Sequence, residues 1–261
     1  TEVVPRTGLL FFNGYGGFSN DGKEYVITTT PATGLAASQG FISTSKLPGE
    51  HGSVNSLGDE STYNATKVSY YTPKFSGFQG GVSYTPQLDD RGQSMTRSDT
   101  TSVNDMFDFG LGYEGTLAGF KLAAAGTYEM GSGNGGGAGV LGSDDVNAWN
   151  VGAVVGFMGF DVAGSYGDWA DSGITARDGD YWTAGVGYSM GPIGTSVTYL
   201  SSTLEVVGGD NEFDNIVVGA DYKLAAGLTP YAEVSFYEFD GVGASYDNEG
   251  TNFILGTQVA F

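Results

Sequence analysis

Histidine and cysteine, which serve most often as nucleophiles, general bases or metal ligands, are almost absent from this chain. It contains no Cys and a single His, His51. A Ser-His hydrolase needs a serine placed beside such a histidine, but His51 lies in a Gly- and Ser-rich stretch with no G-x-S-x-G motif or comparable partner nearby. We therefore interpret His51 as a polar loop residue and expect no catalytic residues and no enzymatic activity.

A glycine-rich motif, Gly131-Ser-Gly-Asn-Gly-Gly136, matches G-x-G-x-x-G by its letters. In a dinucleotide site this motif joins a strand to a helix, whose N-terminus then holds the pyrophosphate. Here the motif follows a strand-like segment, and it opens no helix. We therefore predict a flexible loop tip and no cofactor.

Acidic residues dominate the charge of the chain. Asp and Glu number 30 against 10 Lys and Arg, which gives a net charge of -20. Nucleic-acid binding is not expected, because phosphate contacts need clustered basic side chains. Most carboxylates lie in polar, Gly-rich stretches, where a solvated surface and loop-bound Ca²⁺ or Mg²⁺ are both open interpretations. No stretch has a complete EF-hand spacing, so no metal ligand is assigned.

The elements that carry these residues are predicted to be strands. Apolar and polar residues alternate in segments about 10 residues long, the length of a tilted strand that crosses a membrane. No run of about 18 apolar residues is present, so membrane-spanning helices are not expected. In one such segment the apolar positions are Phe107, Phe109, Leu111 and Tyr113. Further alternating segments begin near residues 120, 149, 160, 182, 193, 216, 232 and 253.

The other face of these segments is small and polar. A dry protein core could not hold such side chains, and a soluble β-sandwich usually has a polar face rich in Lys and Glu. Long strands bordered by Tyr and Phe are instead typical of a transmembrane antiparallel β-barrel, whose apolar face meets lipid. We therefore predict an all-β barrel. Its polar face would include Lys67, Ser69, Gln79, Ser83, Lys121, Thr127, Asn150, Asp161, Thr183, Ser196, Asn215, Asp221 and Glu233.

Connections between the segments alternate in length, as in outer-membrane barrels with short turns on one side and long loops on the other. The predicted short turns are 74–77, 115–119, 156–159, 189–194 and 224–229. The predicted longer connections are 88–104, 131–145, 170–180, 205–211 and 240–250.

Two segments carry a family resemblance. The stretch from Ala65 to Pro86 resembles a hairpin of Gram-negative general porins of the proteobacterial, trimeric type. The stretch from Thr251 to Phe261 resembles the terminal strand that the barrel-assembly machinery recognises. The resemblance extends from about Thr62 to the end. It implies a barrel of about 16 strands in the outer membrane, a homotrimer, contacts with lipid and lipopolysaccharide, and an assembly signal. That signal would comprise Phe253, Leu255, Val259 and Phe261.

Counting back from Phe261 on this template gives about 11 or 12 strands, so residues 1–261 are predicted to be one porin domain that lacks N-terminal strands. An open sheet edge in lipid leaves unpaired backbone groups, each costing several kcal/mol, so the missing strands were removed or the barrel is smaller. We favour removal. The template also places the third extracellular loop, which folds into the pore, at the long polar segment 20–61.

The resemblance implies a water-filled channel for passive diffusion of small hydrophilic solutes and ions. The acidic excess predicts a mild preference for cations. Two alternatives stay open. A substrate-specific channel would show a ladder of aromatic or Arg side chains, and a structural barrel that binds a surface partner would have a plugged lumen. The candidate constriction residues are Asp21, Glu24, Glu50, Asp59, Glu60 and Asp108 on the acidic side, with Lys67 and Lys121 on the basic side.

Overall fold

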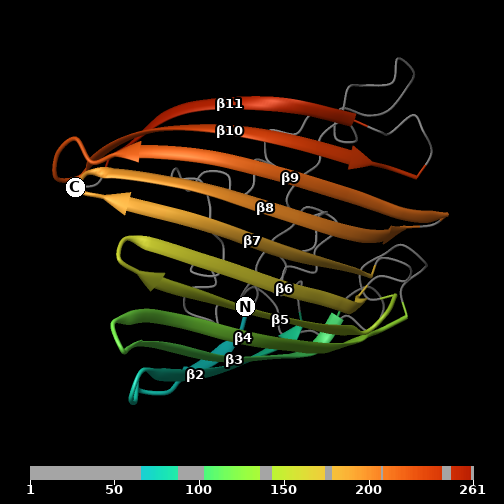
Figure 1. Ribbon diagram of the computed structural model, residues 1–261. Coiled ribbons are helices and arrows are strands. Elements are labelled where there is room, and N and C mark those ends of the chain that lie inside the picture. The colour runs from blue at the N-terminus through green and yellow to red at the C-terminus, as the bar shows by residue number, and fades with distance from the viewer. Residues whose placement is uncertain are drawn as a thin grey trace.

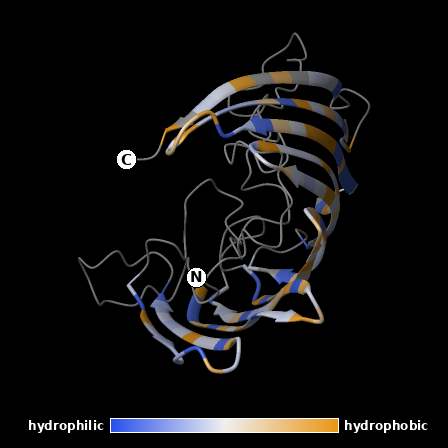
Figure 2. Cartoon of the chain, turned by 60° about the vertical axis from the view of Figure 1, so that its left-hand side comes forward, coloured by the Kyte–Doolittle hydropathy of each residue, from blue (hydrophilic) through white to orange (hydrophobic). Residues whose placement is uncertain are grey.

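One curved antiparallel sheet accounts for the structure of this chain. The computed structural model describes residues 66–87, 103–135, 143–173, 178–206, 208–242 and 248–259. Within these ranges 11 strands pair in sequence order, each with its neighbours along the chain. The sheet bends through a wide arc and is open on one side (Figures 1 and 2). The predicted all-β, antiparallel fold is confirmed.

Most of the strands are long, and each is connected by a turn or a loop to the next one along the chain. Their bounds are β1 Val68–Tyr71, β2 Phe78–Gln87, β3 Val103–Leu117, β4 Phe120–Gly133, β5 Val146–Phe157, β6 Phe160–Ser172, β7 Gly179–Met190, β8 Ile193–Val206, β9 Gly209–Tyr222, β10 Leu228–Asp240 and β11 Asn248–Val259. No helix long and apolar enough to cross a membrane occurs among the residues given above.

Alternation along each strand separates the two faces of the sheet. On β5, Trp149, Val151 and Val155 are exposed, whereas Ala148 and Asn150, on either side of Trp149, are buried. Successive side chains of a strand point to opposite faces, so the exposed set lies on the convex face and the buried set on the concave face. The alternating hydropathy along the strands is visible in Figure 2.

Two rows of aromatic residues border the apolar convex face. Near the long connections, Trp149 packs against Tyr166 with ring centroids 5.4 Å apart. Near the short turns, Phe160 packs against Tyr188 at 4.4 Å. On β5 the rows are separated by the stretch from Trp149 to Phe157, about 26 Å of strand, or about 20 Å in height at a tilt of about 40°. With the rings included, this height suits an apolar band of about 25 Å between aromatic girdles.

Tight hairpins join the strands at one end of the sheet. Ala118 and Gly119 have φ of 51° and 86°, and Met158 and Gly159 have φ of 51° and 85°. Positive φ at both central residues is typical of type I′ turns, whose twist matches that of the flanking strands. The short turns are therefore confirmed, and several are shorter than predicted because the strands continue into them.

The predicted long connection at 205–211 is wrong. Strands β8 and β9 remain paired up to Val206 and Gly209, which leaves only residues 207–208 between them. The acidic residues there resemble a loop in sequence, but a strand that extends beyond the aromatic row enters water and no longer needs apolar positions. Gly208, with φ of 106°, permits the tight reversal.

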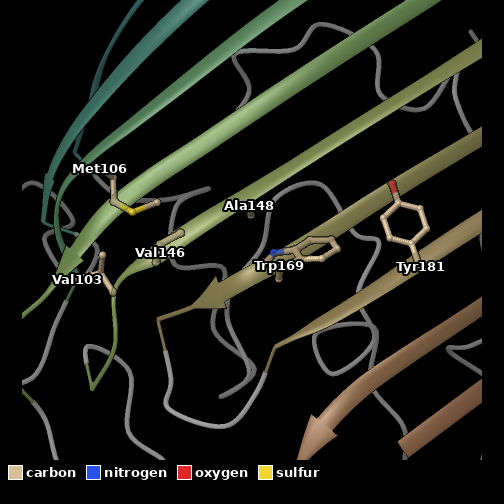
Figure 3. Close-up of a cluster of buried hydrophobic side chains, with 6 residues drawn as sticks. All are labelled: Val103, Met106, Val146, Ala148, Trp169 and Tyr181. Atoms are coloured by element: carbon tan, nitrogen blue, oxygen red, sulfur yellow. The ribbon is translucent and has the colours of Figure 1, made fainter. Parts of the chain in front are cut away.

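The concave face is not uniformly small and polar. Near the long connections of β3–β7, a cluster of buried apolar side chains lies on this face (Figure 3). Trp169 and Tyr181 form its bulky part, with ring centroids 5.9 Å apart. The cluster also contains Val103, Met106, Val146 and Ala148.

Candidate pore wall

A row of polar side chains crosses the concave face from β1 to β4. The strand register places Ser69 opposite Ser83, Ser83 opposite Asp108, and Asp108 opposite Glu129. The Ser69 and Ser83 hydroxyls are 2.9 Å apart and share a hydrogen bond. We call Asp108 and Glu129 the acidic pair.

The acidic pair is buried and directly opposed. Both side chains are 5 % exposed. Residues directly opposite in an antiparallel pair have Cβ atoms about 4.5–5.5 Å apart, so the two carboxylates interact directly. Lys67, just before β1, acts electrostatically on both. One ammonium group therefore faces two carboxylates.

A β-bulge lies next to the acidic pair. The register of β3 and β4 shifts between Asn104 and Phe107, and Asp105 within the bulge has a positive φ of 50°. The Tyr84 hydroxyl donates a hydrogen bond of 2.6 Å to Asp105 Oδ1 from the neighbouring strand. Bulges raise the local twist and redirect side chains, so this contact fixes how β3 enters the wall just before Asp108.

Small residues flank the acidic pair toward the centre of the sheet. Two residues along the strands from the pair, toward the short turns, Gly81 on β2 faces Gly110 on β3. Two residues further in the same direction, Gly112 on β3 faces Ala125 on β4, which faces Gly152 on β5. The corresponding part of the wall on β7–β10 carries the larger side chains of Tyr181, Leu200, Phe213 and Tyr237. The wall on β2–β5 therefore carries smaller side chains in these rows than the wall on β7–β10.

The predicted constriction residues are only partly brought together. Lys67 and Asp108 lie close to one another, as described above. Lys121 is also on the concave side of β4, but it is exposed beside the turn at Ala118–Gly119. Eight residues of one strand, about 26 Å, separate it from Glu129, so it belongs to the rim of the wall. Asp21, Glu24, Glu50, Asp59 and Glu60 lie outside the described residues.

Neither Glu129 nor the ion pair between Lys74 and Glu114 was predicted from the sequence. The signal for Glu129 was available, because Tyr128 and Met130 are outward positions of an alternating strand and the residue between them must face inward. Lys74, in the connection between β1 and β2, places its Nζ 2.6 Å from Oε2 of Glu114 on β3, at the turn end of the sheet. Lys74 and Glu114 are 40 residues apart in the sequence, so their contact could not be predicted without the strand register.

Carboxylates outnumber basic side chains on the described part of the concave face. Asp161, Asp221 and Glu233 lie nearer the short turns than the acidic pair. No three His, Cys, Asp or Glu side chains in the described ranges come together as a group that could hold a metal ion.

The letters G-x-S-x-G do occur once, at Gly187–Gly191. They fall where β7 ends and turns into β8. A nucleophile elbow instead joins a strand to a helix, so Ser189 has no catalytic setting.

Three of the four residues predicted to form the assembly signal lie on β11, the last strand that the structure describes. Phe253, Leu255 and Val259 are exposed on the convex face of β11. Within the described sheet β11 pairs only with β10. Phe261 lies outside the described residues.

Comparison with known proteins yields one family. A family model described as Gram-negative porin matches residues 7–254. An uncharacterized protein of Rickettsia bellii (strain RML369-C) is 29 % identical over 252 residues, which cover 76 % of this chain and 57 % of that protein. The chain thus spans less than two thirds of the length of this relative.

Solved structures share the fold at low identity. An anion-selective porin from Comamonas acidovorans matches with a TM-score of 0.53 and 18 % identity, covering 75 % of this chain and 59 % of that one. The trimer form of in-vitro folded OmpT, an outer membrane protein of Vibrio cholerae, matches with a TM-score of 0.50 and 16 % identity, covering 74 % and 64 %. Such likeness shows a transmembrane β-barrel fold.

Proposed function

This chain belongs to the Gram-negative porin family of the bacterial outer membrane, and from that premise we propose that it forms a water-filled channel for passive diffusion of small hydrophilic solutes and ions. The observation that carries the proposal is the division of the sheet into two unlike faces. The convex face is apolar and bordered by aromatic rows, as lipid requires. The concave face carries Ser, Thr, Asn and carboxylates, which suit contact with water.

The mechanism needs only the shape and fixed charges of the wall. A solute diffuses through the lumen without a covalent step, so no bound cofactor and no catalytic group take part. The family and the fold indicate a non-enzymatic channel. The rate for each solute then depends on its size and on the local potential.

We propose a mild preference for cations. A cation about 5 Å from one uncompensated carboxylate in water gains about 0.8 kcal/mol, which raises its local concentration about fourfold. Beyond the screening length of about 8 Å this effect fades, so only carboxylates that line the pore contribute. We propose that the acidic pair contributes, because it lies on the concave face that would line the lumen. The solved anion-selective porin is 18 % identical to this chain, too distant to transfer its charge preference.

The segment 20–61 is proposed as the inward loop that narrows the pore. Asp21, Glu24, Glu50, Asp59 and Glu60 would supply its acidic side. We further propose a homotrimer, since OmpT of Vibrio cholerae has a trimer form, with contacts to lipid, lipopolysaccharide and the assembly machinery. Loop carboxylates remain proposed Ca²⁺ ligands.

Electrical recording from the purified full-length protein in planar bilayers tests the channel. We expect a current that rises in proportion to voltage, a conductance that rises in proportion to salt concentration, and a zero-current potential of cationic sign in a salt gradient. Saturation with one solute would favour a substrate-specific channel. Absence of conductance from correctly folded protein would favour a structural barrel and refute the proposal.

A further inference from the structure

The two side chains of the acidic pair are close enough to form a hydrogen bond with each other. Ionised carboxylates only accept hydrogen bonds, so a hydrogen bond between two carboxyl groups needs a proton on one of them. Asp108 Oδ2 and Glu129 Oε1 are both buried, and neither accepts a hydrogen bond from an N–H or O–H group of the described residues. One shared proton would therefore supply the donor that the pair lacks.

The position of the pair also disfavours two ionised groups. Asp108 and Glu129 face each other across β3 and β4, and each side chain is only 5 % exposed. Burial and a like charge nearby both oppose the ionisation of a carboxyl group. In such a pair one group ionises while the other stays protonated, and the proton belongs to the pair as a whole.

The strands on either side of the pair contribute no titratable group next to it. On β2, Ser83 faces Asp108, and on β5, Ala148 faces Glu129. The positions two residues away on these strands and the same face are Gly81, Thr85, Val146 and Asn150. Nothing on β2 or β5 beside the pair can therefore take up or release the proton in its place.

Two charged groups lie close to the pair. Asp105, in the bulge of β3, accepts a hydrogen bond from the Tyr84 hydroxyl of β2. Lys67, just before β1, acts electrostatically on both members of the pair. Its ammonium group favours ionisation, so it limits how far the pH can rise before the proton leaves.

We propose that Asp108 and Glu129 share one proton at neutral pH and release it to water as the pH rises, so that the pair is a pH-sensitive charge on the wall. With the proton bound, the pair carries one negative charge beside Lys67. Without it, the pair carries two.

The effect on ion selectivity rests on the proposed channel. One additional carboxylate charge about 5 Å from a permeating cation raises the local cation concentration about fourfold. Release of the proton should therefore increase the preference for cations by up to about fourfold.

The shared proton lowers the repulsion within the pair but leaves a cost in stability. The unfolded chain holds fewer protons at neutral pH than the folded chain, so the free energy of unfolding falls as the pH rises through the range in which the pair releases its proton. This fall should be smaller in D108N/E129Q. Urea unfolding in detergent measures it without any need for conduction.

A second opposed pair provides a matched control. Glu238 on β10 faces Glu249 on β11, and both side chains are exposed on the convex face. E238Q/E249Q therefore removes the same number of carboxyl groups from the same cross-strand geometry without touching the acidic pair.

Infrared spectroscopy of the full chain in detergent tests the shared proton directly. At neutral pH the wild type and E238Q/E249Q should show the C=O stretching band of a protonated carboxyl group, shifted in heavy water, which D108N/E129Q lacks. The band should disappear as the pH rises, and Lys67→Gln should keep it to higher pH. Circular dichroism must show the same strand content in all four proteins. No difference in this band between the wild type and D108N/E129Q would overturn the proposal, as would earlier loss of the band in Lys67→Gln.

Zero-current potentials recorded on the same proteins separate this inference from the channel itself. The preference for K⁺ over Cl⁻ should rise over the pH range in which the wild-type band disappears, and it should stay constant there in D108N/E129Q. A protein that conducts without a band that depends on the pair retains the channel and refutes the shared proton. A protein that shows this band without conducting retains the shared proton and refutes the channel.

Discussion

Asp108 on β3 and Glu129 on β4 stand directly opposite each other on the concave face, and each side chain is only 5 % exposed. Stability alone does not favour this arrangement, because opposed like charges weaken a strand pair. Lys67, just before β1, offsets part of the repulsion. The pair is therefore a place on the described wall where the arrangement of acidic side chains works against stability.

Asp108→Asn should stabilise the folded protein. Removing one charge relieves the repulsion, and we expect a gain of about 0.2–1 kcal/mol in the free energy of unfolding. Urea unfolding in detergent measures this gain. The control Glu238→Gln relieves only an exposed, screened repulsion and should gain less. A loss of stability in Asp108→Asn would show that the pair is not repulsive.

Gly167→Ala should destabilise the wall. A Cβ atom at Gly167 would overlap the ring of Tyr181 on β7 and would lie 3.1 Å from Asn150 Cβ. The Tyr181 ring cannot move away freely, because it is buried and packs against Trp169. Overpacking of this kind costs about 1–3 kcal/mol, which a lower midpoint of urea unfolding would report.

The matched control for this prediction is Gly112→Ala on the same face. Its Cβ atom would meet no atom closer than 3.9 Å. It should therefore unfold near the wild-type midpoint. Equal shifts in the two variants would mean that loss of glycine itself, and not the Tyr181 ring, determines the effect.

Phe261→Ala should impair assembly in the outer membrane. The resemblance assigns the final aromatic residue to the signal read during insertion, and β11 presents the alternating apolar side chains of that signal on its convex face. The amount of folded protein in outer-membrane fractions measures the effect. Phe236→Ala removes an exposed aromatic from the neighbouring strand β10 and should leave assembly near normal. Normal levels of the Phe261 variant would refute this role.

The fold was predictable because lipid and water act on every residue of a barrel strand. Each outward position must be apolar, so positions such as Val151 and Phe157 reveal the strand by their spacing alone. The rule stops where the strand leaves the lipid. The ends of β8 and β9 are polar for that reason, and the sequence there was interpreted as a loop at 205–211.

The site was less predictable because it depends on register. Alternation alone places Asp108 and Glu129 on one face, but only the pairing of β3 with β4 shows that they are opposite each other. In the same way, alternation places Lys121 inward without revealing that it lies at the rim. Trp169 and Tyr181 are aromatic side chains on the otherwise polar concave face, where they pack against each other. Such packing leaves no periodic pattern in the sequence, so it could not be predicted.

Neutralising the acidic residues of segment 20–61 should shift ion selectivity toward anions. Only carboxylates within the screening length of about 8 Å from the permeating ion should matter. The variant carries Asn or Gln at Asp21, Glu24, Glu50, Asp59 and Glu60. The zero-current potential in a salt gradient measures the shift.

An equal number of neutralisations in the predicted outer loops serves as the comparison and should barely move the potential. These positions are Asp89, Asp90, Asp99, Asp144 and Asp145. Equal shifts would show that total loop charge controls selectivity. No shift from the first set would remove segment 20–61 from the pore.

The claim that the concave face lines a conducting lumen is tested most directly by conductance during thiol modification. The chain has no Cys, so a single introduced thiol is unique. Thr127 on β4 faces Gly110 and Asn150 on the concave side, whereas Ala124 on the same strand is exposed on the convex side. A charged, membrane-impermeant thiol reagent should lower the conductance of Thr127→Cys in a discrete step and leave Ala124→Cys unchanged. A step in Ala124→Cys with none in Thr127→Cys would contradict the account.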